Sequence, residues 1–420
     1  MRYCYCRGRF LVSWCVGFIV WIGSVGGSIA QESLSPEALI EAAPAELRTW
    51  LAQSTSQRKL SLGSYPVDQL FDVLPPHIPQ LFAAEIAGGA VPALDVVASQ
   101  VFEVPVSDHV HQLAANGDLD DTTRCGRELP FPSLSPTVAR AGLKAVWNLL
   151  CRNRGGSFEY IAHNLRGSGP NPHRTLVING RYGFGPQGFG FHALMFSPNE
   201  LKGNQMMGWV PWRRADAESI FMYAVEQRRA RQRASARGEL MAGTYFTLEH
   251  GFGWEGQYYF YDWLMLGERP VLTVLNSRHT FPQYLPGNRW FPDDEWMLRP
   301  AFLVVGKRAH NLAGSGYVAL WLDAATFEPL WTVFYTDVGI AQSCSALTYK
   351  WSAEQQRYLM LGESVIELSD GGAPIGGTVF EAPFCSILHN SGRSVDASDF
   401  SGQHLGIKDF SWGRRPVGCE

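Results

Sequence analysis

The chain has 420 residues, of which 18% are charged, 46% hydrophobic and 13% aromatic, and it contains 43 glycines and 25 prolines. This composition excludes a disordered chain, a coiled coil and a collagen-like repeat, and it provides enough apolar residues for a sizeable core. Few charges combined with many glycines, prolines and aromatic residues favour strands and turns over helix bundles.

The first 30 residues have the pattern of a secretory signal peptide. Three arginines precede an apolar stretch at 10–22, which is shorter than the roughly 18 to 20 residues that span a bilayer. Small residues follow and end at Ser28-Ile29-Ala30, so cleavage is predicted after Ala30. The alternative is an uncleaved membrane anchor. We therefore expect an exported protein whose mature form is soluble.

The charge of the mature chain argues against nucleic acid as a partner. Loss of the signal removes three arginines and no acidic residue, so the mature chain is more acidic than the formal net charge of −4. A mildly acidic exported protein has no electrostatic reason to bind nucleic acid. The basic run at 228–237 is an exception. It is either a solvated strand or loop, or a contact for anionic lipid headgroups or an acidic partner.

Five cysteines remain after the signal: Cys125, Cys151, Cys344, Cys385 and Cys419. In an oxidising compartment they allow up to two disulfides with one thiol left over, and the sequence does not determine the pairing. No two of them have Cys-x-x-Cys spacing, so redox catalysis and zinc ribbons are not expected.

Helices are expected before the main block of strands. Residues 31–127 form a helical and Pro-rich N-terminal extension, which either wraps over the core or is a flexible arm; Pro44-Ala45-Glu46 is a typical helix start within it. The clearest helix is predicted at 136–154, with an apolar face and a polar face at helical spacing. Trp147 lies close to the polar face, where an indole either packs or covers an apolar opening.

From residue 157 onward the pattern changes to short strands that are punctuated by Gly, Asn, Asp or Pro. We predict strands at 174–179, 188–196, 219–227, 258–266, 269–275, 296–305, 317–322, 329–336, 346–351 and 358–366. Such a series predicts an antiparallel meander or barrel, with the best hairpin at 323–326. Several strands are apolar on both faces, as 220–225 shows. Either the sheet is covered outside and encloses an apolar space, or it belongs to a sandwich core.

Motifs for chemistry are weak. The glycines of 183–188 match a dinucleotide fingerprint formally, but a strand pattern follows Pro186, so a glycine-rich hairpin is predicted. His109 and His111 could form a metal pair, yet no third ligand stands nearby, and solvated loop histidines are the favoured interpretation. Asp293-Asp294-Glu295 could supply the carboxylates of a sugar hydrolase, although three consecutive acids are typical of a turn. We predict no catalytic residue, metal or cofactor.

Several stretches carry a family resemblance. They are Leu129-Pro-Phe-Pro132 with Gly142–Leu150 and Arg152–Gly155, Tyr223–Arg231, Tyr261-Asp262-Trp263 with Met265–Gly267, Trp296–Arg299 with Arg308, and Leu322–Pro329. In this order and spacing, residues 128–366 resemble a large family of exported Gram-negative proteins of unknown function. That family is grouped with the Lol-type (LolA/LolB-like) outer-membrane lipoprotein-sorting and carrier superfamily.

The resemblance implies a mainly β, α+β fold, in which a curved antiparallel sheet forms an incomplete β-barrel with helices packed in or near its mouth. The half-barrel domain would span 128–380, between the extension at 31–127 and a C-terminal tail at 381–420. Lol-type carriers hold acyl chains in the cavity of such a barrel. The residues expected to bind ligand are Trp147, Arg228, Arg229, Arg231, Tyr261 and Trp263.

The leading hypothesis is a non-enzymatic carrier of a hydrophobic small molecule, lipid or acyl chain, located in the periplasm or at the outer membrane. The first alternative is an exported carbohydrate-active hydrolase or lectin-like module that uses the aromatic surface and Asp293–Glu295. The second is a structural envelope protein that binds a membrane transporter or an outer-membrane protein. Ligand identity, direction of transfer and oligomeric state do not follow from the sequence.

Overall fold

The structure is a computed structural model that describes residues 129–401 with short gaps, and several shorter stretches between 41 and 102. The chain divides into two compact units, 1–33 and 34–420, and every described residue belongs to the second. The predicted signal peptide and cleavage site lie outside the described residues. So do His109, His111 and three of the five cysteines of the mature chain, Cys125, Cys385 and Cys419.

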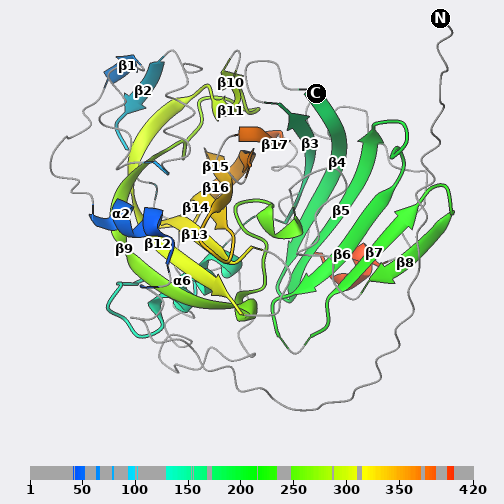
Figure 1. Cartoon of the computed structure of the whole chain (residues 1–420), viewed down its shortest axis with the longest axis horizontal. Coiled ribbons are helices and arrows are strands. Elements are labelled where there is room, and N and C mark those ends of the chain that lie inside the picture. Colours follow the sequence, from blue (N-terminus) through cyan, green and yellow to red (C-terminus); the bar gives the residue numbers. More distant parts are fainter. Residues whose placement is uncertain are drawn as a thin grey trace, which may run out of the picture. The chain divides into compact units, whose positions relative to one another are not determined.

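One large curved sheet dominates the described part of the chain (Figure 1). Its strands there are β1 Gly63–Pro66, β2 Ala93–Val97, β3 Ser157–Arg166, β4 His173–Gly185, β5 Gly188–Ser197, β6 Gln205–Pro211, β7 Ser219–Ala224, β8 Arg229–Arg233, β9 Tyr261–Thr273, β12 Glu295–Arg308, β13 Tyr317–Asp323, β14 Pro329–Tyr335, β15 Ala341–Ser352, β16 Arg357–Leu368 and β17 Pro374–Glu381. A separate two-stranded sheet pairs β10 Tyr284–Leu285 with β11 Asn288–Pro292.

The strand order explains why the sheet stays open. It runs β1-β2-β12-β13-β14-β15-β16-β17-β3-β4-β5-β6-β7-β8, and β9 also pairs with β12. Neighbours are antiparallel except β2, which lies parallel to β12. Nothing in this order pairs β8 with β1 or β9, so the sheet curves without closing. The predicted fold class, a mainly β incomplete barrel with helices, is confirmed.

The predicted helix at 136–154 forms as α6, Ala141–Cys151. It cannot begin earlier because Arg140 has a left-handed backbone, with φ 57°, and it ends at Arg152, which is extended. Gly142 brings the helix directly onto β9, since a Cβ there would lie 2.6 Å from the backbone nitrogen of Leu264. Asn148 of this helix is fully buried, and its side chain satisfies both the N–H and the carbonyl of Phe131.

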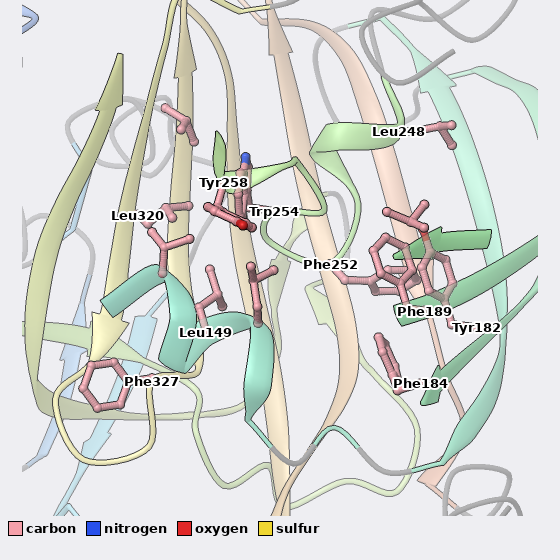
Figure 2. Packing of buried hydrophobic residues seen from close by; sticks show 14 of the residues in the cluster. Leu149, Tyr182, Phe184, Phe189, Leu248, Phe252, Trp254, Tyr258, Leu320 and Phe327 are labelled. Carbon is pink, nitrogen blue, oxygen red and sulfur yellow. The ribbon is translucent and has the colours of Figure 1, made fainter. Parts of the chain in front are cut away.

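Apolar layers cover both faces of the sheet. On the concave face lie α6 and the segment 247–260, which contains the short helical turns η2 Leu248–His250 and η3 Tyr258–Phe260 (Figure 2). The other face packs against Leu47 of helix α2 (Ala45–Ala52), and against β11. A further turn, η4 Ala397–Phe400, packs on β5 and β6.

This double covering accounts for strands that are apolar on both faces. Strands β13 and β14 are buried along their whole length, with alternate side chains in the two layers. The example at 220–225 was wrong, because β7 lies next to the edge strand β8 and Val225 is 40% exposed. The two strands predicted at 258–266 and 269–275 are one strand, β9, because its pairing with β12 continues through Pro270. The hairpins at 183–188 and 323–326 are confirmed.

Candidate functional site

An apolar pocket lies on the concave face of the sheet, between strands β3 to β6, β17 and the segment 247–260. The cavity itself has a volume of only about 30 Å³, and it lies within a depression of about 530 Å³ that includes open solvent. The residues that line it are Tyr160, Ala162, Asn164, Leu176, Ile178, Tyr182, Phe191, Ala193, Met206, Leu248, Gly251, Phe252, Thr378 and Phe380. No acidic or basic side chain is among them.

Small residues between aromatic ones hollow out this part of the sheet. Along β3, Tyr160, Ala162 and Asn164 alternate in sequence, so their side chains point to the same face. Gly180 on β4 leaves room for the ring of Tyr160, because a Cβ there would lie 1.8 Å from Tyr160 Cζ. Ala193 on β5 lies in the same wall. The depression therefore results from short side chains in a ring-rich surface.

The polar groups in the pocket wall bond to other protein groups. Asn164 donates from Nδ2 to the Gly377 carbonyl at 3.2 Å and to Thr378 Oγ1 at 3.1 Å, and its Oδ1 accepts from Thr175 Oγ1 at 2.5 Å. Burial raises the pKa of Tyr160, so this phenol stays neutral. The surface offered to a ligand is consequently uncharged and consists mainly of hydrocarbon and aromatic rings, including the phenol of Tyr160.

Phe252 closes one side of the pocket. Its ring packs against several others, with centroids 4.5 Å from Tyr182, 5.2 Å from Phe158 and 5.2 Å from Phe380. Figure 2 shows it pointing from the segment 247–260 towards Phe189 and Tyr182 of the sheet. Phe252 therefore forms part of the pocket wall that comes from the segment 247–260 and not from the sheet.

A buried carboxylate fixes the backbone at Phe252. Glu363 of β16 accepts from the N–H of Phe252 at 2.6 Å and from the N–H of Gly253 at 3.0 Å. The two donors converge because both residues have positive φ, 51° and 84°. Burial raises the pKa of Glu363 to about 8, although these hydrogen bonds act in the opposite direction.

Further polar contacts anchor the ends of the segment. Near its start, Glu249 accepts from Tyr261 Oη at 3.0 Å and also pairs with Arg308 of β12. Towards its end, Trp263 donates from Nε1 to the Tyr258 carbonyl at 2.8 Å. The segment 247–260 is thus attached to β9, β12 and β16 by buried bonds, while its apolar side chains face the sheet.

The profile of a family described as "Protein of unknown function (DUF1329)" matches residues 98–308. The chain belongs to this family. The predicted resemblance to a family of proteins of unknown function is confirmed. No curated protein matches the chain.

Solved structures with related folds are distant in sequence. A DUF1329 family protein from Desulfovibrio piger is 11% identical and covers 63% of this chain and 98% of its own, with a TM-score of 0.46. A putative outer membrane lipoprotein-sorting protein domain from Vibrio parahaemolyticus is 14% identical and covers 58% and 91%, with a TM-score of 0.44. A LolA superfamily protein from Nitrosomonas europaea is 11% identical and covers 65% and 100%, with a TM-score of 0.39.

None of the six ligand residues predicted from the sequence lines the pocket of this DUF1329 chain. Trp147 is fully buried on α6, with its ring 4.6 Å from that of Tyr258. Tyr261 and Trp263 lie on β9 and hold the segment 247–260, as described above. The remaining three, Arg228, Arg229 and Arg231, are exposed at the β7–β8 turn and along β8. The structure therefore places them in two groups, one within the packing of the segment and one on the edge of the sheet.

The pocket residues escaped the sequence analysis for a physical reason. Tyr160 and Phe191 belong to strands whose aromatic residues alternate, and this period of two could have identified one ring-rich face. Thr378 and Phe380 belong to β17, where no strand was predicted; Gly376 and Gly377 give this stretch a composition that is also common in turns. Phe252 lies outside any regular element, so no periodicity marks it.

The acidic cluster proposed for the hydrolase alternative is engaged in a turn. Asp294 is buried and accepts from the Ser277 hydroxyl and from the N–H of Arg278 at 3.1 Å. Asp293 pairs with Arg278 at 3.2 Å on the surface. Within the described residues, no group of three potential ligands could hold a metal ion. No helix there is long and apolar enough to cross a membrane.

The described cysteines differ in state. Cys151, at the end of α6, is disulfide-bonded. Cys344, in the middle of β15, is a free buried thiol, and burial raises its pKa. The full pairing scheme stays a prediction, because the other three cysteines lie outside the described residues.

Proposed function

We propose that this chain is a non-enzymatic carrier that binds a hydrophobic ligand, a lipid or an acyl chain, in the pocket on the concave face of its sheet. The observation that carries the proposal is the lining: alkyl groups and aromatic rings, among them the phenols of Tyr160 and Tyr182, surround the space, and the Asn164 and Thr378 side chains bond to each other. Burial of apolar ligand surface stabilises such a complex by about 25 cal/mol per Å².

Entry of the ligand requires movement of the segment 247–260 in this proposal. Phe252 stands at the pocket wall. Glu249 anchors the segment shortly before it in the chain, and Glu363 of β16 accepts from its backbone N–H. Trp147 of α6 also holds this segment in place, because its ring packs against Tyr258 near the C-terminal end of the segment. We infer that the residues predicted to bind ligand on α6 and β9 act through the position of this segment.

We place the carrier in the periplasm or at the outer membrane, as the signal-like N-terminus predicts. The arginines of β8 supply a surface for anionic lipid headgroups, since all residues of this edge strand are exposed. Replacement of Arg228, Arg229 and Arg231 by serine should weaken sedimentation with anionic vesicles and leave binding to neutral vesicles unchanged. Unchanged sedimentation would remove the headgroup role of these arginines.

The test of ligand binding is native mass spectrometry of the chain purified without detergent from its own envelope, followed by solvent extraction. We expect a uniform extra mass that extracts as lipid. Ala193→Phe, which fills the pocket, should lose the extra mass, whereas Ala230→Phe on the exposed strand β8 should retain it. A bare wild-type chain that stays bare after incubation with envelope lipids would refute the proposal.

A further inference from the structure

A charged recess adjoins the apolar pocket. Its cavity volume is about 20 Å³, within a space of about 370 Å³ that includes open solvent. Its lining includes Arg152, Arg154 and Glu328 together with the rings of Phe158 and Phe184. Phe252 lines both this recess and the apolar pocket, so its ring is the partition between them. A ligand that extends past Phe252 would therefore have its apolar part in the pocket and its polar end in the recess.

Arg154 lines this recess, and its Nε–H group has no hydrogen-bond partner in the part of the chain that the structure describes. Its Nη1 donates to Glu255 Oε1 at 2.5 Å and its Nη2 to the Leu149 carbonyl at 3.1 Å, while the guanidinium lies 5.0 Å from the centre of the Phe184 ring. The side chain is only 6% exposed, yet its Nε has no hydrogen-bond partner among the described residues. An unmade bond at a buried donor is costly, so the site favours a ligand that brings an acceptor.

The charges in the recess are already balanced. Arg152 pairs with Glu328 at 2.6 Å, and Arg154 pairs with Glu255. Burial raises the pKa of Glu328 in spite of the adjacent arginine, and it lowers the pKa of Arg154, which shows that the surroundings solvate charge poorly. An anionic head would add an uncompensated charge to this environment. The recess is thus suited to an uncharged acceptor.

We propose that the ligand is an acyl ester, with its hydrocarbon chain in the apolar pocket and its uncharged ester carbonyl accepting a hydrogen bond from Arg154 Nε. This inference rests on the carrier function proposed above, and it narrows the ligand from any hydrophobic molecule to an esterified chain. A free fatty acid is excluded by its carboxylate, and a plain hydrocarbon leaves the Arg154 donor unmet.

Three probes of equal chain length test the ligand class: methyl palmitate, palmitate and hexadecane. Each is titrated at neutral pH into the delipidated full chain, loaded with the fluorophore N-phenyl-1-naphthylamine, and displacement is recorded. One hydrogen bond to a charged donor is worth about tenfold in affinity, so methyl palmitate should bind about tenfold more tightly than either competitor. Palmitate binding as tightly as the ester would overturn the inference.

Paired variants assign the effect to Arg154. Arg154→Met with Glu255→Met removes the donor and its carboxylate together, and the preference for the ester over hexadecane should disappear. Arg152→Met with Glu328→Met removes an ion pair of similar burial whose Nε already bonds Glu328, and it should keep the preference. A preference that persists in the Arg154 variant would refute the role of this arginine.

The outcomes separate the two proposals. If no probe displaces the fluorophore, the carrier function itself fails. If methyl palmitate and hexadecane bind equally in the wild type, the carrier function stands and the ester class is refuted. Should either paired variant fail to fold, the ranking of the three probes on the wild-type chain decides alone.

Discussion

Glu363 should make the chain less stable as the pH rises through neutrality. Its carboxyl group is fully buried, and burial raises its pKa from 4.5 to about 8. The folded chain therefore keeps this proton over a range in which the unfolded chain has lost it. By linkage, the free energy of unfolding contributed by Glu363 is complete below about pH 4.5 and declines until about pH 8.

The size of the effect follows from the displacement of the pKa. Between about pH 4.5 and about pH 8, each pH unit lowers the free energy of unfolding by at most about 1.4 kcal/mol. Between about pH 6 and about pH 8 the loss amounts to about 2 kcal/mol, after allowance for partial ionisation at the upper end. A loss of this size is a considerable share of the stability of an ordinary domain.

The assay is urea unfolding of the wild type and Glu363→Gln at both pH values. The glutamine cannot titrate. The difference in the free energy of unfolding between the two proteins should therefore change by about 2 kcal/mol between about pH 6 and about pH 8, because the other titrating groups contribute equally to both proteins. At either pH, Glu363→Gln also loses one hydrogen bond, because Phe252 and Gly253 donate to different oxygens of Glu363 and one of these becomes an NH2 donor in glutamine. Glu354→Gln, on the exposed turn after β15, is the matched control.

Two results would refute the reasoning. Parallel pH profiles for the wild type and Glu363→Gln would show that the carboxyl group has similar pKa values in the folded and unfolded chains. A wild type that gains stability on this account as the pH rises would show that the hydrogen bonds from Phe252 and Gly253 outweigh burial.

Three further substitutions or labels test the packing. Gly180→Ala should destabilise the chain to urea by about 1–3 kcal/mol, because its Cβ meets the Tyr160 ring, and a Tyr160→Ala background should remove most of that penalty. Asp323→Asn should lower the free energy of unfolding by about 3–5 kcal/mol, because it leaves Arg299 without its buried bidentate carboxylate partner. An unchanged midpoint of thermal unfolding would contradict this role of the ion pair. Cys344 should react with a maleimide only when urea unfolds the chain, and labelling of the native chain would show that β15 opens locally.

Local patterns in the sequence identified most long strands of the sheet and two of its hairpins, but they missed β3, β6 and β17. The Asp323–Thr326 turn was recognisable because Asp323 accepts from the backbone of the residues that follow it, which is ordinary turn chemistry. β9 was divided in two at Gly267-Glu268, between the strands predicted at 258–266 and 269–275, whereas pairing with β12 keeps this stretch extended. Propensity is a weak guide where a neighbouring strand decides the conformation.

The pocket could not be found in the same way. Its walls come from strands far apart in the chain, and its lid-like side chain, Phe252, has a positive φ that Glu363 stabilises from β16. Neither the contact nor the conformation leaves a periodic trace in the sequence. The aromatic residues singled out beforehand, Trp147 and Trp263, were noticed for their chemistry, but their surroundings were unknown, and the fold uses them for packing.

The position of β17 between β16 and β3 has a consequence for biogenesis. Asn164 and Thr378 are bonded neighbours in the sheet but stand 214 residues apart in the chain. At roughly 5 to 20 residues per second, a ribosome needs about 10 to 40 s after β3 to synthesise β17, the strand that pairs with it. Until then β3 has an unpaired edge and the aromatic wall beside it is incomplete, which is the situation in which nascent β proteins aggregate. A cell that makes this protein has reason to hold it unfolded until the last strand is available.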